Sequence, residues 1–147
     1  MGRTAMADFA REHTGPEAIL DDLAIARAEL RQWVWGWHRA AVSGIPFPET
    51  ATAEHAHETD NVGQFIQRVW DRLSHLEAIH ELRRYHRILH DEARTAAQVL
   101  RAEGKIPPMQ YDRFADAAQI VDGLFDEIER TLRNGETTPV GSPACAR

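Results

Sequence analysis

The sequence predicts an all-α protein, an up-down four-helix bundle with a disordered C-terminal tail. Apolar residues recur every three or four positions through most of the chain, which is the period of an amphipathic helix. No segment shows the strict alternation of a half-buried strand, and Pro and Gly separate the helical stretches. We therefore divide the chain into a flexible N-terminal arm over 1–13, a helical bundle domain over 14–135 and a disordered tail over 136–147.

The first predicted helix begins at Pro16, because proline is favoured in the first turn of a helix, and it ends near Gly44. It has about 27 residues and a length of roughly 40 Å at 1.5 Å per residue. Residues 45–60 are interpreted as a connector that carries His55 and His57.

The second helix is expected to start near Asp60 or Asn61. Further on, Ser74 is followed three residues later by Glu77, which matches the capping-box pattern at the start of a helix. This pattern predicts a break or kink near Ser74, although one continuous helix is the alternative.

The third helix is predicted from His75 to Glu103, where Gly104 ends it. Pro107 and Pro108 then open the fourth helix, and Asn134-Gly135 terminates it. The short loops between these helices favour antiparallel neighbours in a bundle.

Composition narrows the possible partners. The net charge of −6 argues against nucleic acid and against an anionic membrane surface. No apolar run reaches membrane-spanning length, and the first residues do not resemble a signal peptide. The single Cys145 excludes an intramolecular disulfide. Arginine usage is high and Lys105 is the only lysine, which we attribute to a GC-rich genome. We expect a soluble, cytoplasmic, bacterial protein.

The strongest functional candidate is a pair of histidines on the third helix. His86 and His90 are four residues apart, so both project from one helix face, which is otherwise apolar. Two imidazoles facing a hydrophobic interior are either a metal site or buried polar groups that need partners. A helical pair with this spacing suits zinc and leaves two positions for further ligands.

The sequence offers other candidate histidine ligands and two other kinds of metal site. His38, His55, His75 and His80 are read as surface side chains, although each is also a candidate third ligand. A hemerythrin-like di-iron site fails because no histidine follows His90. A ferritin-like site is weak because Glu77-Ala78-Ile79-His80 is a single copy of a motif that the site needs twice.

The tryptophans of the first helix suggest a second buried surface. Trp33 and Trp37 share one face and should enter the core, whereas Trp35 points about 160° away from them. A tryptophan on an otherwise polar side favours an interface, and a homodimer is the simplest. The alternative is that Trp35 lies under the connector or the N-terminal arm.

No pattern indicates an enzyme. The only cysteine lies in the tail, and the chain has no Gly-rich phosphate loop and no nucleophile elbow. Acidic pairs such as Asp91-Glu92 are read as helix surface.

The stretch from Leu82 to Leu132 resembles the chemoreceptor zinc-binding (CZB) domains of bacterial chemoreceptors and diguanylate cyclases. The resemblance is carried by Leu82-x3-His86-x3-His90-x2-Ala93, then Gly104, then Phe114-x2-Ala117 and Leu124.

Upstream, two ligand positions of that family differ. Trp33 stands where the family has the tryptophan of His-x-x-Trp, but the histidine position is Leu30. The family's Asp-x-x-Cys keeps its aspartate as Asp60 and has Gly63 in place of cysteine. Either zinc is lost and the bundle survives as a binding module, or His57 or another residue restores a ligand. Convergent bundle patterning is the third explanation.

The resemblance implies a non-enzymatic, zinc-binding regulatory or sensor bundle that acts as a homodimer. With no output domain in the chain, its signal would pass through a partner protein. The predicted metal ligands are His86, His90 and His57. The alternative function is a metal-free structural or protein-interaction bundle, in which His86 and His90 are polar core residues.

Overall fold

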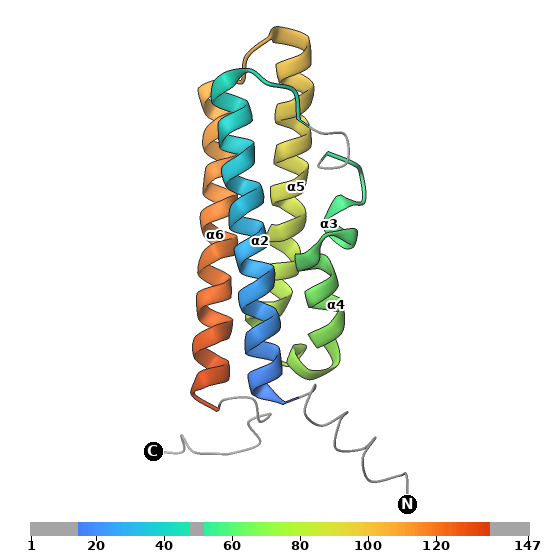
Figure 1. Ribbon diagram of the computed structural model, residues 1–147, viewed down its shortest axis with the longest axis vertical. Coiled ribbons are helices and arrows are strands. Elements are labelled where there is room, and N and C mark those ends of the chain that lie inside the picture. The colour runs from blue at the N-terminus through green and yellow to red at the C-terminus, as the bar shows by residue number, and fades with distance from the viewer. Residues whose placement is uncertain (1–14, 48–51, 136–147) are drawn as a thin grey trace, which may run out of the picture.

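The computed structural model describes residues 15–47 and 52–135, which form five helices and no strand. This confirms the all-α prediction for the described residues. Figure 1 shows the long helices side by side, with a shorter helix next to them. The predicted arm over 1–13, the predicted tail over 136–147 and Cys145 lie outside the described residues. Nowhere in the described ranges is a helix both long enough and apolar enough to cross a membrane.

The long helices are α2 (Pro16–Ser43), α5 (Glu77–Glu103) and α6 (Pro108–Arg133), and the shorter one is α4 (Asn61–Leu73). α5 contacts α6 along its length, while α4 contacts both α2 and α5 (Figure 1). The predicted limits of the first and last helices are confirmed, with Pro16 in the first turn of α2 and Pro108 in the first turn of α6.

Two glycines end helices as the sequence predicts. Gly44 after α2 has φ 67° and Gly104 after α5 has φ 74°, a left-handed conformation that residues with a Cβ rarely adopt. The amide of Gly104 donates to the carbonyl of Leu100 at 2.8 Å, which satisfies one of the last carbonyls of the helix.

The predicted break near Ser74 is confirmed, but the capping box is wrong. Ser74 has a helical backbone and its amide donates to the carbonyl of Trp70, so it closes α4 instead of opening α5. The helix then begins two residues later than expected, with Leu76 as N-cap and no capping side chain. A serine in helical φ/ψ cannot take the extended conformation that an N-cap requires.

The connector contains a short helix that the sequence did not predict. α3 (Ala56–Thr59) is a single turn, and Asp60 both ends it and begins α4. Four residues are too few to show a helical apolar period. Figure 1 places α3 directly against the start of α4 and beside α5.

The core is apolar along the whole bundle and contains two buried polar residues. As expected, Trp37 is buried and Trp33 packs against the core, whereas Trp35 is 65% exposed. His86 and His90 are the buried polar side chains of the described residues. The largest fully buried apolar side chains are those of Leu23, Phe65, Leu73, Ile79, Leu82, Leu89, Phe114, Phe125 and Ile128.

Candidate metal centre

α5 delivers the two histidines to the same point in the core. His86 is 1% exposed and His90 is 6% exposed, one helical turn apart. Their Nε2 atoms lie 3.2 Å from each other, and their ring centroids are 4.7 Å apart. The shared face that the sequence predicted for this pair is therefore present, and both imidazoles point away from solvent.

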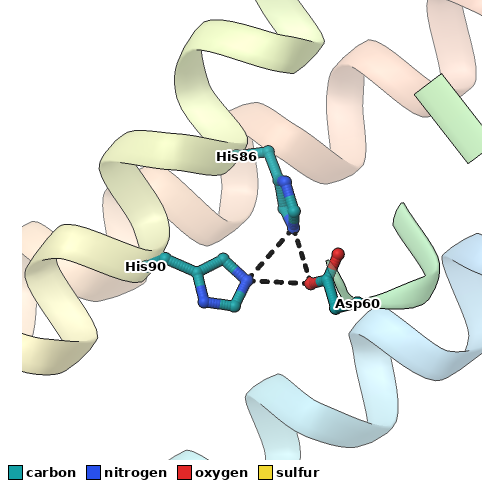
Figure 2. A group of neighbouring side chains, drawn as sticks. All are labelled: Asp60, His86 and His90. Carbon is teal, nitrogen blue, oxygen red and sulfur yellow. Dashed lines mark hydrogen bonds and ion pairs between the residues drawn. The ribbon is translucent and has the colours of Figure 1, made fainter. Parts of the chain in front are cut away.

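Asp60 completes the cluster from the other side (Figure 2). As the N-cap of α4 it accepts a hydrogen bond at Oδ1 from the amide of Gly63, at 2.7 Å. Its other oxygen, Oδ2, lies 2.9 Å from His86 Nε2 and 2.8 Å from His90 Nε2. The cap fixes the carboxylate so that its second oxygen faces both imidazoles.

Hydrogen bonds can account for only two of the three contacts in this cluster. Asp60 Oδ2 and the two Nε2 atoms form a triangle whose three sides are all of hydrogen-bond length. Each Nε2 carries at most one hydrogen, and an ionised carboxylate carries none. If both hydrogens point to Asp60, its Oδ2 accepts two hydrogen bonds and the contact between the two Nε2 atoms contains no hydrogen. If one nitrogen is bare, its lone pair faces the carboxylate oxygen. One cation bound by all three atoms would account for all three short separations.

The electrostatics of the cluster favour the protonation states that a metal requires. Burial alone raises the pKa of the Asp60 carboxyl, but hydrogen bonds with His86, His90 and the Gly63 amide place that pKa well below its usual range. Burial lowers the pKa of His86, against the hydrogen bond and the charge of Asp60. The carboxylate is therefore ionised and the His86 imidazole neutral at pH 7, as metal ligation needs.

The ligand spacing is close to that of a tetrahedral ion. An ion with bonds of about 2.0–2.1 Å holds its tetrahedral ligands about 3.3 Å apart. The three separations here are 2.9, 2.8 and 3.2 Å, so the two distances to Asp60 must widen by about 0.4–0.5 Å and the distance between the imidazoles by about 0.1 Å. Across residues 15–47 and 52–135, Asp60, His86 and His90 are the one group of three or more potential ligands whose atoms converge in this way. These residues could hold a metal ion.

Aromatic stacking holds His90 in place. The ring of Trp33 stacks on that imidazole at a centroid distance of 4.8 Å. The Nδ1 atom of His90 is buried and has no hydrogen-bond partner, so stacking on the indole, and not a hydrogen bond at Nδ1, keeps this imidazole in its orientation.

The third predicted ligand, His57, lies next to the cluster but outside it. It sits on α3, and its ring centroid is 6.3 Å from that of His90. Its assignment as a ligand stays a prediction. Asp60 was not among the predicted ligands, although the sequence carried a signal for it, because it is the retained aspartate of the Asp-x-x-Cys pattern.

The remaining histidines have other surroundings. His80 donates from Nε2 to the carbonyl of Ser74 at 2.6 Å, and His38 Nδ1 lies 2.6 Å from the hydroxyl of Tyr111. His55 and His75 are exposed.

The two positions at which the sequence departs from the CZB pattern, Leu30 and Gly63, line two different pockets next to the cluster. Leu30 lines a pocket of about 580 Å³ together with Trp33, Asp60 and His90. Gly63 lines a second pocket, of about 400 Å³, together with His57 and His86.

Comparison of the chain with known proteins found no matching family model, no matching curated sequence and no matching solved structure.

Proposed function

We propose that this protein is a regulatory bundle that binds one zinc ion through Asp60, His86 and His90. The observation that carries the proposal is the convergence of Asp60 Oδ2 with two imidazole nitrogens, because hydrogen bonds can account for at most two of their three short separations. A buried set of polar atoms is costly unless every member has a partner, and a divalent cation would be a partner for all three.

The donor types favour zinc among the divalent metals. Imidazole nitrogen suits Zn²⁺, Cu²⁺, Ni²⁺ and Fe²⁺, whereas Ca²⁺ and Mg²⁺ prefer sites made of oxygen. Zinc accepts a mixed set of two nitrogens and one oxygen without a geometric preference of its own. The resemblance of residues 82–132 to CZB domains points to the same metal.

The position of the site suggests how zinc binding would change the packing of the helices. Asp60 begins α4 and the histidines lie in the middle of α5, so one ion would tie these two helices together. We infer that α2, α4, α5 and α6 act as an up-down four-helix bundle whose packing responds to zinc. The response would reach a partner protein through the bundle surface, as a non-enzymatic signal.

Elemental analysis of the purified protein tests the proposal. After equilibration with zinc and removal of free ion, we expect one zinc per chain, and none in the double variant H86A/H90A. The matched control is H75A/H80A, which also removes two histidines but leaves the cluster intact and should keep its zinc.

Two results would contradict the proposal. One is a wild-type chain that retains no metal after loading. The other is an H86A/H90A variant that retains as much zinc as the wild type.

A second candidate function, a homodimeric interaction module, is favoured by Trp35. Its side chain is 65% exposed on α2, and it borders a groove with Val34 and with the small residues Ala118 and Gly123 of α6. Large exposed aromatics are enriched where proteins associate. We propose that this face contacts a second copy of the chain.

The variant W35E should move the sedimentation coefficient from dimer to monomer, because it places a charge in the contact. I25E is the control, since Ile25 is exposed to a similar extent (59%) on α2 but does not line the groove. A wild-type chain that sediments as a monomer at all concentrations would contradict the proposed homodimer.

A further inference from the structure

The short helix α3 places a third imidazole, that of His57, beside the side chains of Asp60, His86 and His90. The side chain of His57 is 15% exposed, and its Nδ1 is buried without a hydrogen-bond partner. Its Nε2 lies 3.6 Å from Glu58 Oε1, beyond normal hydrogen-bond length. A largely buried imidazole with an unused nitrogen is costly unless a ligand uses that nitrogen.

Gly63 is what allows α3 to lie this close. A Cβ on Gly63 would stand 2.3 Å from the carbonyl oxygen of His57 and 2.8 Å from the carbonyl carbon and oxygen of Glu58. These are backbone atoms, which cannot rotate away as the end of a side chain can. Any residue larger than glycine at this position would therefore push α3 away from α4. The amide of the same glycine holds Asp60 in place.

We propose that His57 is the fourth ligand of the ion and that the missing side chain of Gly63 lets α3 bring it to the site. This inference rests on the proposed zinc site at Asp60, His86 and His90.

The required movement is small. Two imidazoles that bind one tetrahedral ion at about 2.0–2.1 Å have ring centroids about 5 Å apart. The centroids of His57 and His90 are 6.3 Å apart, so the two rings have to approach by about 1 Å. Neither nitrogen of His57 lies within 4.8 Å of all three cluster atoms, so the imidazole also has to turn a nitrogen toward them. α3 is one turn long and has no capping side chain at its N-terminus. Such a turn can shift without breaking the packing of the long helices.

A fourth protein ligand would close the coordination sphere. Three histidines and one carboxylate fill the four positions of a tetrahedral zinc ion and leave none for water. A closed site retains its metal and does not activate a hydroxide, which fits a regulatory role. It would also make α3 the element whose position reports metal occupancy.

Zinc affinity, measured by competition with a chromophoric chelator, tests the proposal. We expect H57A to weaken zinc binding by about 100-fold or more, because a direct ligand should contribute at least as much as an outer-shell partner. G63A should have an effect of the same size. If both variants act through His57, the double variant H57A/G63A should be no weaker than H57A alone.

Two controls match these variants. H55A removes an exposed histidine two residues before His57. G36A adds a methyl group inside α2, where a Cβ would meet no atom within 4 Å. Both should bind zinc as the wild type does.

The absorption spectrum of the Co²⁺-loaded protein separates the failure of this inference from the failure of the zinc site. A wild type that binds neither zinc nor cobalt contradicts the proposed function. A wild type that binds zinc, with an H57A variant of equal affinity and an unchanged cobalt spectrum, overturns the role of His57 and leaves the three-ligand site standing.

The Gly63 variant has its own decisive outcome. A loss of affinity in G63A but not in H57A would mean that Gly63 acts through the capping of Asp60, and this would overturn the proposal. If G63A does not fold, H57A and its cobalt spectrum decide the role of His57 by themselves.

Discussion

Zinc should raise the free energy of unfolding by about 4 kcal/mol when the free ion is about 1,000-fold above its dissociation constant. The reason is that the ligands converge only in the folded chain, since Asp60 is 26 residues from His86 and 30 residues from His90. Urea unfolding followed by circular dichroism, with zinc and with a chelator, measures the gain. The gain should shrink as the pH falls, because the imidazoles must lose their protons to bind the ion.

The variant H86A should lose this gain completely, while H80A should keep it. His80 is a suitable control because it lies on the same helix and its Nε2 contacts the carbonyl of Ser74, away from the cluster. An equal zinc-dependent gain in H86A and wild type would mean that the ion binds somewhere else.

Removal of the Asp60 side chain should destabilise the metal-free protein by about 2–4 kcal/mol. Loss of an N-cap accounts for about 1 kcal/mol of this, because the amide of Gly63 loses its acceptor. The remainder, about 1–3 kcal/mol, comes from two buried imidazoles that lose the carboxylate between them. Urea unfolding of D60A in the presence of a chelator gives the value.

Comparison with D60N divides this effect into its two parts. Asparagine keeps a carbonyl oxygen that can cap α4, so D60N should be more stable than D60A without metal. D60N should nevertheless bind zinc weakly, because the negative charge of the carboxylate is lost. D116A, which changes an exposed aspartate of α6, should stay within about 0.5 kcal/mol of the wild type. A D60A variant as stable as D116A would mean that the cluster contributes nothing to the fold.

Taken together, these experiments separate a metal site from a polar core. A metal-free bundle would be destabilised by D60A but would show no zinc-dependent gain. A zinc site would show both effects, and the loss of the gain would follow the ligands Asp60, His86 and His90 individually.

The sequence by itself determined the helical class and most helix boundaries, because these depend on local chemistry. Pro16 and Pro108 suit the first turn of a helix but not its interior, and Gly44 and Gly104 supply the left-handed φ that ends one. The shared face of His86 and His90 is also local, since it follows from 3.6 residues per turn.

Only the tertiary structure decided that Asp60 joins the two histidines and where α3 lies. Asp60 contacts two histidines that are 26 and 30 residues away in the sequence. The spacing of apolar residues within a helix does not predict a contact at such a separation. α3 is too short to show an apolar repeat, and Gly63 reads as an ordinary helix residue until the backbone of His57 is seen against it. A local pattern reports which face a residue occupies. Which other segment meets that face depends on how the whole chain packs.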